Sequence, residues 1–379
     1  MPHYKFDQIA FNITDKKMPE PGDEKMYIGL EHLDSGSLKI TRWGSEVELT
    51  GQKLVMRKGD VLFGRRNTYL RRAAIAPHDG IFSAHGMIFR PKTQVIDPEY
   101  FPFFISSNYF MDAAIRISVG SLSPTVNWKT LKELEFDLPS LEEQRKNAAL
   151  LKSINETKEA YQELLIQTDN LVKSQFIEMF GDPIDNEKDW PFELLPNVTT
   201  IVLGSTPRTN NDAYWDGDIK WISPAELSDE SFYVYDTVKH ITEEGVKSAG
   251  LKSFPANTVL FSTRAPIGKT AIAGCEMYCN QGFKNFICGP RLNPVYLYYL
   301  LRHKKEHFQS LGSGTTFREL SRGAIEKIAI AVPDMELQDR FEKIFRQSDK
   351  SKFELKEAIK SCDALMKAIL FTNLEEKEG

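Results

Sequence analysis

The second half of this 379-residue chain is a diverged copy of its first half, about 195 residues further along. The segment Gly59–Phe63 (GDVLF) matches Asn257–Phe261 (NTVLF) at an offset of 198 residues, and Leu134–Pro139 (LEFDLP) lies over Ile328–Pro333 (IAIAVP) at an offset of 194. An offset that changes this little across most of the repeat is not expected by chance. A tandem duplication restricts the fold to two copies of one structural unit.

Each copy changes character at a proline. Before Pro139 and before Pro333, short β-branched runs such as Ile81–Phe89 alternate with turn residues, which predicts strands with some helices. After each proline the pattern becomes purely helical. We therefore predict an α+β fold with two globular domains, at residues 1–139 and 182–333, and two long helices, at residues 140–181 and 334–379.

Both long helices show the alternating three-and-four spacing of a coiled-coil seam. The first seam runs through Leu151, Ile154, Tyr161, Leu165, Val172 and Met179, and the second through Phe345, Ser348, Lys352, Leu355, Ile359, Cys362, Met366 and Ile369. About 40 helical residues span roughly 60 Å. We predict that the helices pair as an antiparallel coiled coil, because each begins beside a different globule.

Six apolar side chains lie off the narrowest stripe of these helices. We expect them to seat helices of partner subunits, and the pseudo-symmetry of the duplication predicts two such partners per chain. They are Leu150, Leu164 and Leu171 on the first helix, and Ile344, Leu365 and Leu370 on the second.

Composition and charge limit the classes of protein. Hydrophobic residues make up 41% and charged residues 27%, which is typical of a soluble globular chain, and no apolar run approaches the ~18 residues of a membrane span. Four cysteines do not form a disulfide framework, so we expect the reducing cytoplasm. The net charge is −5, yet residues 53–72 carry seven Lys or Arg against Asp60 alone. Such a patch is either a solvated strip or a binding surface for a polyanion.

The motifs that suggest catalysis are incomplete. Asn293–Tyr296 (NPVY) resembles the amine-gripping motif of adenine methyltransferases but lacks its second proline, and no glycine-rich cofactor loop follows a strand. The equivalent Asp97–Tyr100 favours a structural interpretation, in which Asp or Asn caps a helix and Pro opens it. We predict no catalytic residue and no metal ligand, since neither Cys275/Cys279 nor His303/His307 has the partners of a metal site.

Polar, aromatic and basic loops at matched positions in the two copies predict DNA binding. Arginine can grip phosphates or read guanine, asparagine suits adenine, and hydroxyl groups suit phosphate oxygens. In the first copy the candidates are Arg65, Arg66, Asn67, Tyr69, Arg71, Arg72, His85, Ser121, Ser123, Asn127 and Lys129. In the second copy they are Thr206, Arg208, Asn211, Tyr214, Trp215, Arg264, Lys269, Asn280, Gln281, Lys284, Thr315, Thr316 and Arg318.

The second copy resembles the target-recognition domains of the specificity subunits of type I restriction-modification systems. The resemblance rests on GSTPR at 204–208 with Tyr214-Trp215, on VLFSTRAPIGK at 259–269 and on NQGF at 280–283. The spacing Pro-x4-Gln that opens each long helix, at Pro139/Gln144 and Pro333/Gln338, belongs to the same pattern. The first copy departs from it, because Arg65–Tyr69 replaces the Arg-x-Pro-x-Gly string.

This resemblance implies that each globule reads one half of a bipartite double-stranded DNA site. The helices would act as a spacer and dock two methyltransferase (modification) subunits, and restriction/translocase subunits would complete the complex. S-adenosylmethionine, ATP and Mg²⁺ would then belong to the partners, with no cofactor on this chain. Two alternatives stay open: a free-standing DNA methyltransferase or nuclease, and a coiled-coil scaffold without a DNA role.

Overall fold

The computed structural model describes residues 2–182, 186–264, 266–310, 312 and 319–372, with the side chains of 371 and 372 left out. The chain divides into two compact units, Met1–Leu164 with Leu355–Gly379, and Leu165–Glu354. These units cut across the four segments predicted from sequence, because each long helix contributes to both hydrophobic cores. Among the described residues, no helix combines the length and apolar character that a membrane span requires.

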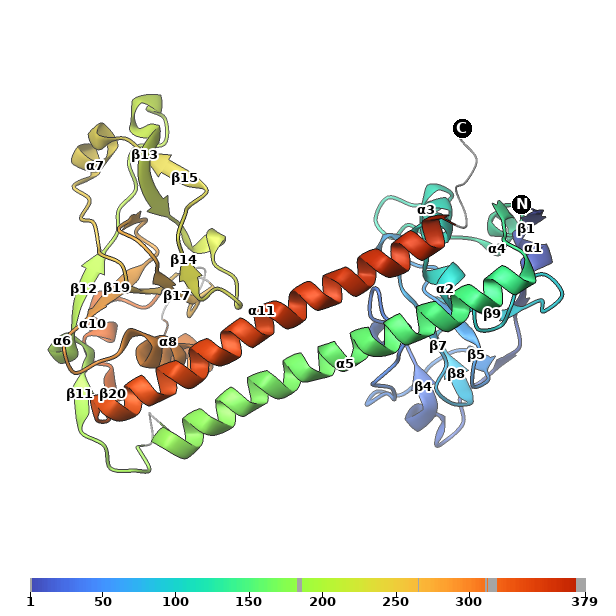
Figure 1. Cartoon of the computed structure of the whole chain (residues 1–379), viewed down its shortest axis with the longest axis horizontal. Helices are drawn as coiled ribbons and strands as arrows, with labels where there is room; N and C mark the ends of the chain where they lie inside the picture. Colours follow the sequence, from blue (N-terminus) through green and yellow to red (C-terminus); the bar gives the residue numbers. More distant parts are fainter. Residues whose placement is uncertain (1, 183–185, 265, 311, 313–318, 373–379) are drawn as a thin grey trace. The chain divides into compact units, whose positions relative to one another are not determined.

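The first unit contains two four-stranded sheets and a separate strand pair (Figure 1). Its strands are β1 (His3–Lys5), β2 (Ala10–Ile13), β3 (Lys16–Lys17), β4 (Tyr27–Ile28), β5 (Lys53–Met56), β6 (Val61–Phe63), β7 (Ala73–Ile75), β8 (Gly80–Phe82), β9 (Met87–Pro91) and β10 (Glu135–Asp137). The sheet orders are β2-β9-β6-β7 and β3-β5-β8-β4, and β1 pairs with β10. All pairs are antiparallel except β4 with β8.

The second unit repeats this plan with additions. Its strands are β11 (Phe192–Leu194), β12 (Thr199–Leu203), β13 (Trp215–Ile222), β14 (Tyr233–Val234), β15 (Lys239–Ile241), β16 (Val259–Phe261), β17 (Thr270–Ala273), β18 (Tyr278–Cys279), β19 (Lys284–Cys288) and β20 (Ala329–Ala331). The order β12-β19-β16-β17 reproduces β2-β9-β6-β7, β11 pairs with β20 as β1 does with β10, and β13 pairs parallel with β18 as β4 does with β8. The duplication inferred from sequence is therefore present in the topology.

Two of the helices, α5 (Leu141–Phe180) and α11 (Met335–Thr372), are long, and the other described α-helices have ten residues or fewer. The shorter ones are α1 (Phe6–Ile9), α2 (Phe101–Ser106), α3 (Asn108–Arg116), α4 (Trp128–Leu131), α6 (Leu195–Val198), α7 (Glu243–Ala249), α8 (Pro294–His303), α9 (Lys305–Ser310) and α10 (Arg322–Ile325). The α+β prediction with two long helices is confirmed. Gly181, at φ +69°, ends α5, and its N–H donates to the carbonyl of Ile177 (2.8 Å).

The interpretation of the NPVY string as a helix start is confirmed. The Asn293 side chain accepts hydrogen bonds from the N–H groups of Val295 (2.8 Å) and Tyr296 (3.4 Å), and Pro294 is the first residue of α8. In the first copy, Asp97 caps the N–H groups of Glu99 and Tyr100 in the same way, although α2 itself begins at Phe101.

The glutamine of each Pro-x4-Gln spacing is fully buried and anchors a long helix to its globule. Gln144 accepts from the N–H of Asp97 (2.8 Å) and donates to the carbonyls of Val95 (3.1 Å) and Pro139 (2.9 Å). Gln338 makes the equivalent three bonds, to Asn293 N (2.8 Å), Arg291 O (3.0 Å) and Pro333 O (2.6 Å). The spacing therefore encodes a side chain that satisfies three backbone groups at the start of the helix.

The long helices pair antiparallel in each unit, as predicted (Figure 1). In the first unit, Leu151 of α5 and Leu370 of α11 belong to one core, together with Phe6, Phe89 and Phe136. In the second unit, Phe180 of α5 packs on Phe341 of α11 with ring centroids 5.6 Å apart. Each end of α5 therefore meets the opposite end of α11, and this packing stabilises both globules.

Candidate nucleic-acid interface

Two loops that are far apart in sequence lie side by side in the first unit. The arginine loop (residues 64–72) follows β6, and the hairpin loop (residues 118–127) follows α3. The N–H of Val126 donates to the carbonyl of Arg65 (3.0 Å), and Arg66 forms a bridge with Thr125. The fold thus joins two of the segments that the sequence nominated separately.

Arg65 and Arg66 differ in exposure. Arg66 is exposed, and its Nη2 lies 3.4 Å from the Ser123 Oγ of the hairpin loop. Arg65 is half-buried, and its Nη2 donates to the carbonyl of Ala84 (3.4 Å), which brings the exposed His85 into the same neighbourhood. The cluster therefore combines a free guanidinium group, a hydroxyl group and an imidazole ring.

The arginine loop is conformationally strained. Asn67 and Arg71 have φ values of +54° and +49°, a left-handed conformation that side chains other than glycine rarely adopt. Buried polar atoms without a hydrogen-bond partner include Arg65 Nε, Asn67 Oδ1 and Arg72 Nε, all in this loop. The arginine loop thus holds two residues in a left-handed conformation close to the exposed Arg66.

Arg71 and Arg72, also predicted to bind DNA, have contacts within the protein. Arg71 forms an ion pair with Asp112 and donates to Asn108 Oδ1 (3.2 Å). Arg72 is half-buried and donates to the carbonyl of Leu30 (2.8 Å). The Asp112 carboxylate offsets the charge of Arg71, and among the described residues of this loop Arg66 is the one arginine that is exposed.

The hairpin loop exposes two apolar side chains that the sequence analysis did not single out. The N–H groups and carbonyls of Val119 and Thr125 bond reciprocally (3.1 and 2.9 Å), and Gly120 has a φ of +118°. Leu122 at the tip is 94% exposed and Val119 is 72% exposed. Tyr69, Ser121, Asn127 and Lys129 are also exposed, so all four predicted side chains are accessible to a ligand.

The second unit joins loops at the repeat-equivalent positions. The N–H of Thr263 donates to the carbonyl of Gly282 (2.8 Å), and the N–H of Leu320 donates to Thr263 O (2.9 Å), as Val126 does to Arg65. The Thr206 hydroxyl group bonds Gln281 Oε1. Residues 204–208, 262–264, 266–269 and 280–283 of the predicted segments therefore form one cluster, and Arg264 and Gln281 are exposed within it.

Several predicted side chains of the second unit also have structural contacts. Arg264 Nε pairs with Glu319 (3.1 Å), and Lys269 donates to Pro224 O (3.2 Å). The Asn280 side chain accepts from Gly282 N (2.8 Å) and shapes its own turn. Asn211 caps the turn that leads to Tyr214 and Trp215, both half-buried, and the Trp215 indole donates to the carbonyl of the exposed Arg208 (3.2 Å). The predicted residues Thr315, Thr316 and Arg318 lie outside the described residues.

The model of the type I restriction-modification DNA specificity domain matches this chain twice, at residues 11–167 and 187–361. The chain belongs to this family. The two matches coincide with the two sequence copies and with the two sets of clustered loops.

Curated relatives are specificity subunits of type I restriction enzymes. The MjaIX subunit of Methanocaldococcus jannaschii is 36% identical over 165 residues, which is 43% of this chain and 38% of that subunit. The MjaX subunit of the same organism is 22% identical over 349 residues, covering 84% of this chain and 79% of its own length. The alignment to MjaIX thus spans well under half of that relative.

Solved structures share the fold along the whole chain. The type I S subunit from M. genitalium aligns with a TM-score of 0.62 at 12% identity and covers 99% of this chain and 96% of its own. A chain from a study of type I R-M complex assembly aligns with a TM-score of 0.58 at 22% identity, over 98% and 97%. The tandem arrangement with two long helices is therefore a property of the family fold.

Lys284 was predicted to bind DNA, but the structure places it among the buried residues. Its side chain is 7% exposed, and its ammonium group donates to Thr263 Oγ1 (3.0 Å) and Leu320 O (2.8 Å), with Glu319 at 3.4 Å. Burial lowers the pKa of Lys284, and Glu319 acts in the opposite direction. The ammonium group thus connects β19 to the loops that hold Thr263 and Leu320.

Lys284→Met is expected to destabilise the second unit by about 2 kcal/mol, because it leaves a buried carbonyl and a hydroxyl group without their donor. Chemical denaturation measures the change. Arg264→Met is the matched control: it removes the exposed partner of the same Glu319 and should change stability by less than about 0.5 kcal/mol. A stable Lys284→Met protein that has lost DNA affinity would restore Lys284 as a contact residue.

The apolar residues predicted to dock partners divide into three groups. Leu150, Leu164, Leu171 and Leu365 are between 45% and 55% exposed, which leaves their side chains accessible. Ile344 is half-buried. Leu370, also predicted to dock a partner, is buried in the first core and packs on its own globule.

Within the described residues, no group of three or more His, Cys, Asp or Glu side chains could hold a metal ion. Cys279 is buried beside Asn285, whose Nδ2 lies 3.1 Å from the sulfur, and burial raises the pKa of the Cys279 thiol to about 12.

Proposed function

We propose that this chain is the DNA-recognition subunit of a type I restriction-modification complex, in which each globule reads one half of a bipartite duplex site. The observation that carries this proposal is the loop cluster that recurs at equivalent positions of both units. Arg66 and Arg264, 198 residues apart, each sit in a loop that follows the equivalent strand and is bonded to a later loop of the same globule.

The chemistry of the clusters suits duplex DNA. An exposed guanidinium group can bond a phosphate or the O6 and N7 atoms of guanine, and neighbouring Ser, Thr, Gln and Asn side chains can bond phosphates or base edges. The two clusters differ in side chains: the first has Arg65, Arg66 and His85, and the second has Arg264 and Gln281. Different side chains on a shared scaffold support the reading of two different half-site sequences.

The accessible leucines of α5 and α11 support docking of partner subunits on the helix pair. We propose two methyltransferase subunits per chain, and restriction/translocase subunits that join them. S-adenosylmethionine, ATP and Mg²⁺ are proposed to bind those partners, with this chain non-catalytic, free of cofactor and cytoplasmic. A native mass with a single methyltransferase subunit per chain at saturation would contradict this stoichiometry.

The decisive experiment is selection of binding sites from a random duplex library by the purified chain with its methyltransferase partner. We expect two short blocks of sequence separated by a fixed number of unselected base pairs. Enrichment of one continuous block, or of no sequence at all, would contradict bipartite recognition.

The second candidate function is a free-standing DNA methyltransferase, suggested by Asn293–Tyr296. The structure gives these residues another role, since Asn293 Oδ1 caps α8 and Asn293 Nδ2 donates to Asp339 (2.9 Å) and Glu342 (2.6 Å). Incubation of the chain alone with DNA and labelled S-adenosylmethionine separates the two candidates. Methyl transfer without a partner would favour the enzyme.

A further inference from the structure

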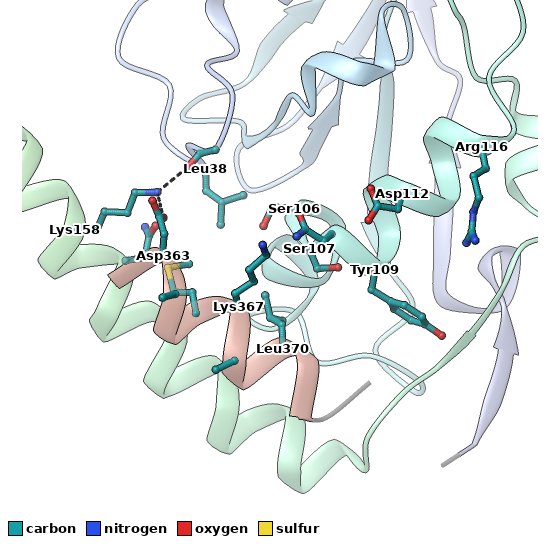
Figure 2. Close-up of a pocket in the computed structure, with 16 residues that line it drawn as sticks. Leu38, Ser106, Ser107, Tyr109, Asp112, Arg116, Lys158, Asp363, Lys367 and Leu370 are labelled. Carbon is teal, nitrogen blue, oxygen red and sulfur yellow. Dashed lines mark hydrogen bonds and ion pairs between the residues drawn. The ribbon is translucent and has the colours of Figure 1, made fainter. Parts of the chain in front are cut away.

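Lys158 is a charged residue in the apolar seam between the two long helices. Its side chain is 9% exposed, its Nζ lies 2.6 Å from Asp363 Oδ1 of α11, and it donates to the carbonyl of Gly36 (3.0 Å). Figure 2 shows Lys158 extending from α5 to Asp363 at the edge of a cavity of about 1170 Å³, which Tyr109 and Lys367 also line. A nearly buried ammonium group is costly unless it is paired, so this position favours an acidic residue opposite.

A second ion pair crosses the helix pair in the other unit. Lys352 of α11 lies 2.9 Å from Asp169 of α5. Lys352 is 194 residues after Lys158, and Asp363 is 194 residues after Asp169, so the two pairs are copies of one another under the duplication. Each helix thus carries one lysine and one aspartate in equivalent positions, and each pair uses one residue from either helix.

The two pairs share a single register with the apolar contacts between the helices. Residue 169 lies eleven residues after residue 158 on α5, and its partner, residue 352, lies eleven residues before residue 363 on α11, as an antiparallel register requires. The Phe180–Phe341 contact continues this register for eleven more steps. Leu151 and Leu370, seven steps in the opposite direction, also follow it within one core.

A parallel arrangement, or an antiparallel one in another register, would place these charged residues opposite residues of like charge or no charge. In the parallel arrangement that superimposes the two copies, Lys158 faces Lys352 and Asp169 faces Asp363, so like charges meet. A slip by one heptad in either direction leaves all four charges without an opposite charge. After such a slip, Lys158 would face Lys356 or Leu370, and Asp363 would face Leu151 or Leu165. Lys352 would face Gln162 or Phe176, and Asp169 would face Phe345 or Ile359.

We propose that the Lys158–Asp363 and Lys352–Asp169 pairs determine the antiparallel orientation and the register of the helix pair. Apolar seams alone tolerate heptad slips, because leucine packs on leucine in several registers. The largely buried Lys158 and Lys352 side chains, 9% and 21% exposed, instead favour the register that places an acid within reach, although Asp363 and Asp169 are themselves 54% and 66% exposed. The proposal concerns pairing within this chain and does not require DNA binding. Under the proposed function, the register also contributes to the spacing between half-sites, since each residue of slip moves a helix by about 1.5 Å.

The test is a charge exchange confined to α11. Lys352→Asp with Asp363→Lys keeps composition and net charge, but opposes Lys158 to lysine and Asp169 to aspartate. Distance labels are attached through encoded azide side chains at the exposed Lys146 of α5 and Lys360 of α11, leaving the native cysteines intact. A slip of one heptad moves these labels by roughly 10 Å along the axis. We expect the exchange to shift or broaden the single distance measured in the native chain.

The rescue variant adds Lys158→Asp and Asp169→Lys, which restores opposite charges at both sites while retaining the α11 changes. We expect it to recover the native distance, although the carbonyl of Gly36 loses its donor. A native distance in the α11 exchange would overturn the proposal, and so would failure of the four-residue variant to recover it. If the α11 exchange does not fold, recovery of folding and of the native distance by the four-residue variant supports the proposal, because the two proteins share every α11 substitution.

Discussion

Gln144→Leu is expected to lower the free energy of unfolding of the first unit by about 3 kcal/mol. Leucine fills a similar volume but can make none of the three bonds that Gln144 makes to the backbone of Val95, Asp97 and Pro139. A buried backbone group without a partner costs about 1–3 kcal/mol, and part of this cost is recovered by local relaxation. The loss of stability is large because one side chain makes hydrogen bonds both to the backbone of the globule and to the backbone that precedes α5.

Denaturant unfolding followed by hydrogen exchange of peptides from β2, β6 and β9 localises the effect to the first unit. Gln162→Leu is the matched control, since it makes the same change at an exposed position of the same helix and should alter stability by less than about 0.5 kcal/mol. Equal stability of the two variants would show that the Gln144 bonds do not anchor the helix.

Replacing both Arg65 and Arg66 by alanine is expected to weaken binding to the proposed DNA site about 100-fold. A base-reading arginine contributes about 1–3 kcal/mol, and each lost phosphate contact lowers the salt dependence by about one ion. Because both residues belong to the first unit, the base preference in the selected sequences should weaken in one half-site only. Fluorescence anisotropy at several salt concentrations, followed by site selection, measures both effects.

The control for this pair is Arg42→Ala with Lys39→Ala, which removes two positive charges from the same unit. Both residues lie outside the arginine loop and the hairpin loop. Arg42 forms an ion pair with Asp34 (2.7 Å), and Lys39 forms one with Glu159 (3.5 Å). Equal losses in the two double variants would mean that only the overall charge matters. A loss in both half-sites would contradict the assignment of one half-site to each globule.

Much of the architecture was readable from local patterns. The repeat offset predicted two similar units, the absence of Pro and Gly after Pro139 predicted α5, and the alternation of apolar residues predicted its seam. Asn293 was interpreted correctly as a helix cap because capping depends on residues within one turn. The helix cap and the helical seam follow from short-range rules, since each depends on a few neighbouring residues.

Site residues were less predictable, because their roles depend on contacts between distant segments. Lys284 looks like any basic loop residue in the sequence, but Thr263 and Leu320 surround it in the fold. Arg71 is paired with an aspartate 41 residues away. Leu122 carries no motif, and only its place at the tip of a bonded hairpin shows that it is exposed.

The sequence by itself determined the duplication, the two long helices, the Asn293 cap of α8 and the family, because these are written in periodicity and in short motifs. Only the tertiary structure decided which charges are free and which are internal: Arg66 is exposed, whereas Arg72 and Lys284 are held by backbone carbonyls. The same holds for Lys158. In the sequence it only interrupts the apolar seam, and the tertiary structure shows that Asp363 lies opposite it. The physical reason is that a side chain's charge is local, while its burial and its partner are set by chain segments that meet only when the protein folds.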